Sequence, residues 1–352
     1  MAAKIIKVNP VNPEEKYCAA AAEAIRAGGL VIIPTDTVYG IAADGSNKQA
    51  LERLIAVKGR PGNKPFSLLV ADKAAVAEYT ADIPVAAYKL IDRFWPGPLT
   101  IVFKAISGGT VGIRMPDDKT ALKVIGMALP GVVCPSANLS GKPAPVTFAE
   151  AIKELRNSVD LALDAGPTRG GVESTVVDVT KQPVVVLREG AVSAQDVRLT
   201  AGKKTVLFIC TGNSCRSVMA QGLLAKKLQD QKRDNVEVLS AGIMFTGGLG
   251  ASYETRELLA KRGVDVSGHR SQRVTIDMLN KADIILVMER LHEQRLLQLH
   301  PQVKNRLFLL KEFAQVTEND LDIPDPIGRP KEFYEQTMAI IEQAVDKISR
   351  II

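Results

Sequence analysis

The chain has 352 residues, more than one hydrophobic core usually supports, so two domains of about 150–200 residues each are expected. Its composition, 46% hydrophobic and 24% charged, is ordinary for a folded protein, and no apolar stretch approaches the roughly 20 residues of a membrane span or forms a signal-peptide core. The net charge of +6 is shared evenly, with 23 Lys+Arg against 20 Asp+Glu up to residue 200 and 22 against 19 beyond it, which excludes a dedicated nucleic-acid stripe but suits anionic substrates.

Apolar periodicity predicts an α/β pattern in the first part of the chain. A helix over residues 13–29, closed by Gly28 and Gly29, is followed by a buried strand over residues 30–35. The later elements are predicted, in chain order, at 66–71 (strand), 74–80 (helix), 99–104 (strand), 131–134 (strand), 147–157 (helix), 174–179 (strand) and 184–189 (strand). A polar segment near 195–203 is predicted to be a linker before a strand at 205–209, so domains are expected at 1–200 and 201–352.

Four cysteines, two of them in one short loop, argue against a secreted disulfide framework. We therefore expect a cytoplasmic protein that does not meet a membrane. All three histidines lie beyond residue 200, so the first domain has neither a Ser-His-Asp triad nor a histidine-bound metal.

The second domain opens with the loop CTGNSCRS, residues 210–217, between a predicted strand and a predicted helix. Such a loop aims backbone N–H groups and a helix dipole at one point, which binds an anion and favours the thiolate of Cys210. Arg216 can hold two phosphate oxygens, and Ser217 can donate to a leaving thiolate. The loop between the cysteines consists of Thr211, Gly212, Asn213 and Ser214. A structural zinc site or two buried cysteines are the less favoured alternatives, because only distant histidines remain as ligands.

The spacing C-x(4)-C-R-S after a strand, with a distant "IPDPIG", resembles the low-molecular-weight protein phosphatases over about residues 203–352. The resemblance implies a central parallel four-stranded sheet flanked by helices. It also implies that Cys210 attacks phosphorus, that Asp325 acts as general acid and then as base, and that Cys215 traps an oxidised Cys210 as a disulfide. His269 is interpreted as a structural hydrogen-bonding residue rather than a catalyst.

Two departures from the tyrosine phosphatases of this family bear on the substrate. Ile327 and Gly328 stand where those enzymes carry aromatic residues after Asp-Pro, and Ser214 stands where a bulky aliphatic residue is frequent. A small polar residue at that position is similar to the protein-arginine phosphatases. We therefore predict phosphoarginine in phosphorylated proteins as the substrate, with a tyrosine phosphatase or an arsenate reductase as the alternatives.

Three cations of the first domain, Lys58, Arg60 and Lys64, lie within seven residues among glycines and prolines. That spacing suits a polyphosphate, although a solvated charge run is the common alternative. Neither G-x-x-x-x-G-K-[ST] nor G-x-G-x-x-G occurs, so the common nucleotide fingerprints do not apply.

With "PTDTVYG", "PSANLSGKPAP", "GIRMP", "ESTVVDV" and "VLREGA", this stretch resembles the YrdC-like family, the threonylcarbamoyl-AMP synthases, over about residues 5–195. The resemblance implies a twisted mixed sheet with helices and a basic concave face. It also implies a nucleotidyltransferase that converts L-threonine, bicarbonate and ATP into threonylcarbamoyl-AMP and pyrophosphate. A downstream transferase enzyme then modifies tRNA.

The same resemblance implies residue roles. Residues expected at ATP are Lys58, Arg60, Lys64, Thr110, Ser136, Asn138 and Arg188; those expected at threonine are Thr35, Thr37, Arg114 and Ser174. Mg²⁺ is expected with ATP, without an organic prosthetic group or a metal site made by the protein. Ala144 departs from relatives that carry a serine near the nucleotide. We expect a bifunctional enzyme; the alternative is a non-catalytic RNA-binding module, and weak RNA binding is compatible with either interpretation.

Overall fold

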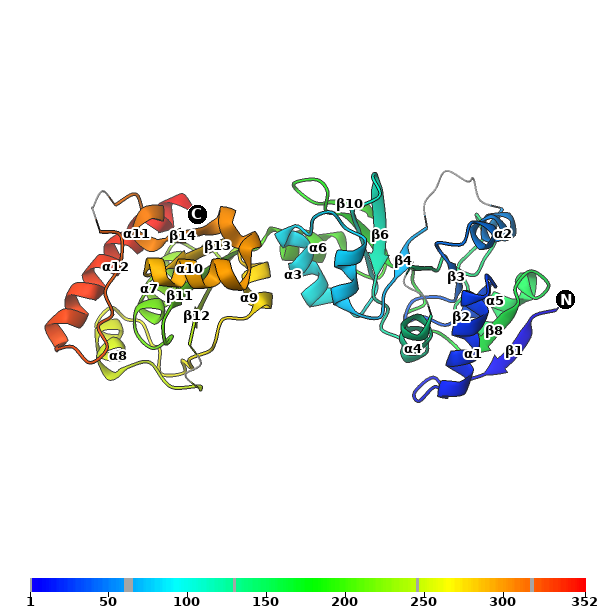
Figure 1. Cartoon of the computed structure of the whole chain (residues 1–352), viewed down its shortest axis with the longest axis horizontal. Helices are drawn as coiled ribbons and strands as arrows, with labels where there is room; N and C mark the ends of the chain where they lie inside the picture. The colour runs from blue at the N-terminus through cyan, green and yellow to red at the C-terminus, as the bar shows by residue number, and fades with distance from the viewer. Residues whose placement is uncertain (1, 60–65, 129–130, 245–246, 317–319) are drawn as a thin grey trace. The chain divides into compact units, whose positions relative to one another are not determined.

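The computed structural model describes residues 2–59, 66–128, 131–244, 247–316 and 320–352 (Figure 1). The chain forms two compact units, Met1–Ala201 and Gly202–Ile352. Across the described ranges, every helix is too short or too polar to cross a bilayer.

The first unit is built on a mixed sheet in which ten strands fall within the described residues. Pairs such as β1 with β8 and β5 with β9 are parallel, whereas β2 with β3 and β5 with β6 are antiparallel. The mixed sheet expected for this part of the chain is confirmed. From edge to edge the strands are β1 (Lys4–Lys7), β8 (Leu161–Asp164), β2 (Val31–Ile33), β3 (Gly40–Asp44), β7 (Val132–Val133), β4 (Leu68–Leu69), β6 (Thr110–Arg114), β5 (Leu99–Lys104), β9 (Thr175–Asp178) and β10 (Val185–Arg188).

Helices cover both faces of the part of this sheet that contains β2. Because successive strand residues point to opposite faces, Val31 and Ile33 pack with α1 and α4, while Ile32 packs with α2 and α5. Burial on both faces explains why β2 is a continuous apolar run. The helices of the unit are α1 (Glu15–Arg26), α2 (Lys48–Lys58), the 3-10 helix η1 (Lys73–Glu78), α3 (Val85–Phe94), α4 (Lys119–Met127), α5 (Phe148–Leu155) and α6 (Ala194–Gly202).

The part of the sheet around β5 is covered differently. Ile101 and Phe103 pack on one face against Leu90 of α3 and Val197 of α6. Thr100 directly precedes Ile101, so its side chain points to the opposite face, where it lines a cavity. One face of β5 is therefore core, and the other is open to a polar site.

Two segments differ from what the sequence predicts. Residues 194–202 form α6 rather than a linker, because Val197 is fully buried and Ser193 accepts a hydrogen bond from the Asp196 N–H (3.0 Å), as an N-cap serine does. The helix predicted over residues 74–80 is a 3-10 helix that spans Lys73–Glu78. The short strands β1, β3, β6 and β8 are additional to the prediction.

The second unit contains a sheet of four parallel strands, as expected from the phosphatase resemblance. In spatial order they are β12 (Val236–Gly242), β11 (Lys204–Cys210), β13 (Ile284–Val287) and β14 (Leu307–Leu309). Its helices are α7 (Arg216–Asp230), α8 (Tyr253–Ala260), α9 (Ile276–Lys281), α10 (Arg290–Leu299), the 3-10 helix η2 (Pro301–Arg306), α11 (Leu310–Phe313) and α12 (Lys331–Ile351).

The central strand β11 separates two hydrophobic cores. Val206 and Phe208 pack on one face with α7 and α12, and Leu207 and Ile209 pack on the other face with α9 and α10. Cys210 continues the first set. Because side chains alternate between the two faces of the strand, Cys210 lies at the end of β11 on the face that α7 covers.

Candidate active sites

The loop that joins β11 to α7 folds around Cys210, which is only 3% exposed. It ends at Cys215, the N-cap of α7, whose side chain makes no capping hydrogen bond. The first N–H groups of α7 thus remain available to an anion, which the helix dipole also favours. Gly242 at the end of β12 lies against this loop, because a Cβ there would be 2.7 Å from the Thr211 carbonyl oxygen.

Asn213 holds the loop in shape. It is fully buried and has a left-handed backbone, with φ 53°. Its Oδ1 accepts from the Gln272 N–H (3.0 Å), which fixes the orientation of the amide. Its Nδ2 therefore donates to the hydroxyls of Ser217 (3.0 Å) and Ser240 (2.8 Å).

This orientation determines what Ser217 does for Cys210. The Ser217 hydroxyl lies 3.0 Å from the Cys210 sulfur, and because its oxygen accepts from Asn213, its proton can be donated to the sulfur. The Asn213 N–H also points at the sulfur, at 3.3 Å. Two hydrogen-bond donors therefore point at the Cys210 sulfur.

Arg216 connects the loop to the segment that carries the predicted general acid. Its side chain is 1% exposed. Nη1 donates to the Ile323 carbonyl (2.7 Å) and pairs with Glu289 (2.9 Å). Nη2 pairs with the Asp325 carboxylate and donates to the Thr211 hydroxyl (3.2 Å). The predicted phosphate-binding arginine and the predicted general acid thus meet in one place.

His292 of α10 is fully buried and contacts the loop at Thr211. Burial, with the nearby Arg216 charge as the second cause, lowers the pKa of His292 to about 4, so the ring is neutral at neutral pH. Nδ1 accepts from the Glu289 N–H (3.1 Å), and Nε2 lies 3.0 Å from the Thr211 hydroxyl oxygen.

The second loop cysteine has its own surroundings. The Cys215 sulfur lies 3.6 Å from the Ser214 hydroxyl and 3.9 Å from the Tyr334 hydroxyl. Burial and Cys215 raise the pKa of Tyr334 to about 12, so this phenol stays protonated. Gly212 and Ser214 are half-buried, and the backbone carbonyl of Ser214 accepts from the Ser252 N–H (3.0 Å).

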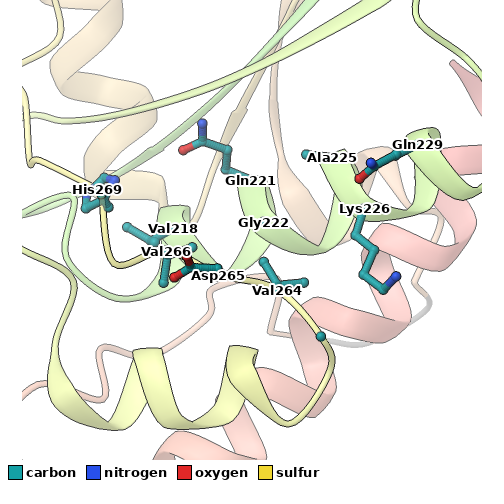
Figure 2. A pocket seen from close by; sticks show the side chains of 12 residues that line it. Val218, Gln221, Gly222, Ala225, Lys226, Gln229, Val264, Asp265, Val266 and His269 are labelled. Atoms are coloured by element: carbon teal, nitrogen blue, oxygen red, sulfur yellow. The ribbon is translucent and has the colours of Figure 1, made fainter.

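A separate cavity of about 490 Å³ lies along α7, beside residues 263–269. Figure 2 shows His269 at one end of it and Lys226 at the other, with Val218 and Val264 between them. His269 Nε2 donates to the Asn213 carbonyl oxygen (2.7 Å). The structure places His269 as a support of the loop backbone.

The first unit contains a cavity of about 620 Å³. Seven residues predicted to bind ATP or threonine line it: Thr35, Thr37, Lys58, Arg114, Ser136, Ser174 and Arg188. They come from distant parts of the chain and meet on the face of the sheet that α3 and α6 leave free.

Arg114 is a buried cation of this cavity, 7% exposed. Nε donates to the Gly97 carbonyl (3.0 Å), Nη1 donates to the Thr37 hydroxyl (2.8 Å), and Nη2 pairs with Asp36. Burial lowers the pKa of Arg114, and the Asp36 carboxylate opposes that shift. The guanidinium is therefore held rigidly in one plane.

Thr35 shapes the turn that presents Thr37. The Thr35 hydroxyl donates to the Val38 carbonyl (2.6 Å) and accepts from the Thr37 N–H (3.2 Å). The two threonine hydroxyls are 3.0 Å apart. Thr35 thus fixes a turn, and Thr37 carries the contact with Arg114.

Arg188 and Ser174 form a second polar group in the cavity. Arg188 Nη1 donates to Glu173 (3.1 Å), and Nη2 donates to the Ser174 carbonyl (2.8 Å). The Ser174 hydroxyl lies 2.8 Å from the Thr100 hydroxyl.

Lys58, at the end of α2, is 4% exposed and binds the loop that carries two other predicted residues. Its ammonium donates to the Ser136 carbonyl (2.6 Å) and to the carbonyl and side-chain oxygens of Asn138 (2.7 and 3.0 Å). Asn138 also lines a neighbouring cavity of about 410 Å³, together with Ala144.

The remaining predicted ATP residues are Thr110, Arg60 and Lys64. Thr110 is exposed on β6, four residues from Arg114 and thus on the same face, about 13 Å away at strand spacing. It does not line the 620 Å³ cavity. Arg60 and Lys64 lie outside the described residues, so their roles stay predictions.

Two family profiles match consecutive parts of the chain. The Sua5/YciO/YrdC profile, described as telomere recombination, matches residues 23–190. The profile of the low molecular weight phosphotyrosine protein phosphatases matches residues 205–351.

Relatives match the same two parts. The threonylcarbamoyl-AMP synthase of Pyrococcus abyssi is 36% identical over 219 residues, 60% of this chain and 64% of the relative. A protein of Methanocaldococcus jannaschii that bears this name provisionally is 35% identical over 201 residues, 54% of this chain and 95% of the relative. A protein of Ralstonia solanacearum named provisionally as the low molecular weight protein-tyrosine-phosphatase EpsP is 38% identical over 143 residues, 41% of this chain and 92% of the relative.

The chain belongs to both families. It spans 64% of the length of the P. abyssi relative and 58% of that of the Bacillus subtilis threonylcarbamoyl-AMP synthase. The crystal structure of P. abyssi Sua5 complexed with L-threonine is 26% identical, with a TM-score of 0.54, and the match covers 77% of this chain and 99% of that chain.

Sequence reasoning missed partners that the fold supplies from far along the chain. In the phosphatase-family unit these are Glu289 and His292. Glu289, the N-cap of α10, pairs with Arg216, and His292 of α10 contacts the Thr211 hydroxyl in the loop. In the YrdC-family unit they are Asp36, which pairs with Arg114, and Cys134, which lines the cavity. Burial raises the pKa of Cys134 to about 12, so its thiol is not a nucleophile at neutral pH.

Proposed function

We propose that the YrdC-family unit makes threonylcarbamoyl-AMP from L-threonine, bicarbonate and ATP, which a separate transferase uses to modify tRNA. The observation that carries this proposal is the buried, planar Arg114 fork beside the Thr37 hydroxyl in a cavity that also holds Lys58 and Arg188. A guanidinium in such a place recognises a carboxylate. The solved P. abyssi relative was complexed with L-threonine, which supports threonine as the ligand.

The chemistry follows from this placement. The threonine amine and bicarbonate give a carbamate and water, and a carbamate oxygen then attacks the α-phosphorus of ATP. The bond to the bridging oxygen of the β-phosphate breaks, and pyrophosphate leaves. Lys58 and Arg188 supply positive charge for the phosphates. Mg²⁺ bound with ATP would offset the remaining charge of the phosphates.

The Arg114 guanidinium has capacity for the carboxylate. Three of its five N–H groups donate to Gly97, Thr37 and Asp36 within the described residues, so up to two are left. Asp36 is thus a partner that keeps the fork oriented while threonine binds.

Pyrophosphate release tests this proposal. With ATP present, release should require both threonine and bicarbonate, and Arg60→Ala should abolish it while phosphatase turnover continues. Release without threonine, or none with all three substrates, would favour the RNA-binding alternative.

We propose that the phosphatase-family unit removes phosphate from proteins through a phosphocysteine. The observation that supports this proposal most directly is that Cys210, Arg216 and Asp325 lie together at the N-terminus of α7. The Cys210 thiolate attacks phosphorus, the bond to the leaving atom breaks, and Asp325 gives that atom its proton. Water then attacks the phosphocysteine, Asp325 takes a proton from it, and phosphate leaves with the thiolate restored.

Two substitutions test this mechanism. Cys210→Ser should abolish turnover. Asp325→Asn should slow phenyl phosphate more than para-nitrophenyl phosphate, because the poorer leaving group needs the proton more. An equal loss on both substrates would remove Asp325 from the role of general acid.

The finer part of the proposal is that the substrate is phosphoarginine. Support comes from the Ser214 hydroxyl in the loop, which can accept from a guanidinium N–H, and from Ile327, 61% exposed after the Asp-Pro pair. A stranded guanidinium N–H costs about 1–3 kcal/mol, so Ser214→Ile should reverse a wild-type preference for phosphoarginine over phosphotyrosine. If the wild type instead prefers phosphotyrosine, Tyr253, which is 69% exposed beside Ser252, would be the residue that stacks on the substrate ring.

A further inference from the structure

The hydroxyl of Thr211, the first residue after Cys210, is contacted by two nitrogen groups. Arg216 Nη2 donates to its oxygen at 3.2 Å, and His292 Nε2 lies 3.0 Å from the same oxygen. A guanidinium nitrogen can only donate, but an imidazole nitrogen can donate or accept. The role of Thr211 therefore depends on which nitrogen of His292 carries the proton.

The backbone around His292 settles that question. The Glu289 N–H donates to His292 Nδ1 at 3.1 Å, so Nδ1 is the unprotonated nitrogen. His292 is fully buried and its pKa is about 4, so at neutral pH the ring carries a single proton. That proton is on Nε2. Glu289 Oε2 lies 3.6 Å from Nε2, beyond hydrogen-bond distance, so Nε2 donates to Thr211 at 3.0 Å.

Because two donors contact its oxygen, the Thr211 hydroxyl can only donate its proton to a third group. A hydroxyl has two acceptor positions and one proton, and both acceptor positions are filled by Arg216 and His292. The proton must point away from both donors. Arg216 Nη2 also pairs with Asp325, so this hydroxyl lies where the transferred phosphoryl group meets the arginine and the acid.

We propose that His292 is a positioning residue that makes the Thr211 hydroxyl a hydrogen-bond donor to a phosphoryl oxygen. This inference rests on the proposed phosphatase function and adds a side-chain donor to the backbone donors of the loop. Its distinctive feature is that a neutral histidine, without touching the substrate, fixes the direction of a hydroxyl that does.

His292 also caps α10 through Nδ1, so a simple deletion would mix structural and functional effects. Two substitutions separate them. The Oδ1 of an asparagine at 292 can reproduce the Nδ1 contact with Glu289, but its side chain is too short to reach Thr211. The amide nitrogen of a glutamine can reproduce the Nε2 donation, but the contact with Glu289 is lost.

We expect His292→Asn to keep the thermal stability of the unit while kcat/KM for para-nitrophenyl phosphate falls by about tenfold or more, the range for one hydrogen bond to a charged group. His292→Gln should do the opposite, with a lower Tm and kcat/KM within about threefold of wild type. If activity instead follows Tm across the two variants, the role of His292 is structural and the proposal is wrong.

Thr211 gives the second arm of the experiment. Thr211→Val should weaken competitive inhibition by inorganic phosphate and lower kcat/KM by about tenfold or more, whereas Thr211→Ser should stay within about threefold of wild type. In the Thr211→Val background, His292→Asn should have no further effect, because both changes remove the same bond. Additive effects, or an unchanged Thr211→Val enzyme, would overturn the proposal.

The result separates this inference from the proposed function. If the wild type fails to hydrolyse para-nitrophenyl phosphate, the proposed function fails. Calorimetric titration of wild type, Thr211→Val and Thr211→Ser with inorganic phosphate then still decides the inference, because weaker binding by Thr211→Val alone supports it and equal binding by all three contradicts it.

Discussion

Replacing Asn213 should destabilise the second unit in two separable parts. The first part is the hydrogen-bond network. Without the amide, the Gln272 N–H loses its acceptor, and Ser217 and Ser240 lose a donor. The Ser217 and Ser240 hydroxyls are buried, and each net hydrogen bond contributes about 1 kcal/mol, so losing the three bonds is expected to cost about 3 kcal/mol in Asn213→Gly.

The second part is the backbone. With φ 53°, residue 213 has a left-handed conformation that costs an alanine roughly 1 kcal/mol more than a glycine. Asn213→Ala should therefore lose about 4 kcal/mol in total. The difference between the two variants measures the backbone contribution alone.

Urea unfolding provides the assay. Circular dichroism follows both units, while the single tryptophan, Trp95, reports the first unit and acts as an internal control. With a slope of about 1–3 kcal/mol per molar urea, the transition of the second unit should shift by about 1–3 M while the Trp95 transition stays in place. A loss below about 1 kcal/mol for both variants would refute the network, and equal losses would refute the backbone argument.

Three further predictions concern other parts of the molecule. Gly242→Ala places a methyl group 2.7 Å from the Thr211 carbonyl and should abolish phosphatase turnover, whereas Gly250→Ala, with nothing within 4 Å, should leave turnover unchanged. Arg114→Lys keeps the charge but loses the planar fork, so steady-state kinetics should show a larger rise in KM for threonine than for ATP. Folding lowers the pKa of His292 from 6.5 to about 4, so the unfolded chain takes up the proton first as the pH falls. Urea titrations should therefore show up to about 3 kcal/mol of stability lost between pH 6.5 and about 4, with less loss in His292→Gln.

The chemistry of the cysteine loop could be predicted from the sequence because it is local. Eight consecutive residues contain the nucleophile, the arginine and the serine, and a strand before them and a helix after them fix their geometry. The same reasoning fails for Glu289 and His292, because nothing in the residues around them signals contact with Arg216 or Thr211, which lie more than 70 positions away. Their approach depends on how α10 packs beside β13 and β14.

The cavity of the first unit shows the same limit. Separate motifs predict Arg114 and Thr37 as site residues, but their direct contact and the pairing with Asp36 depend on strand order, which single-sequence periodicity does not specify. The predicted linker failed for another reason. Its polar composition hides one apolar residue, Val197, whose burial stabilises α6.

The central claim is that one chain carries two active sites that work independently. The most direct test measures pyrophosphate release, dependent on threonine and bicarbonate, and para-nitrophenyl phosphate hydrolysis on the same preparations of the full chain: wild type, Arg114→Ala and Cys210→Ser. We expect both activities in the wild type, hydrolysis alone in Arg114→Ala, and pyrophosphate release alone in Cys210→Ser. Loss of both activities in either variant, or the absence of one from the wild type, would contradict the account.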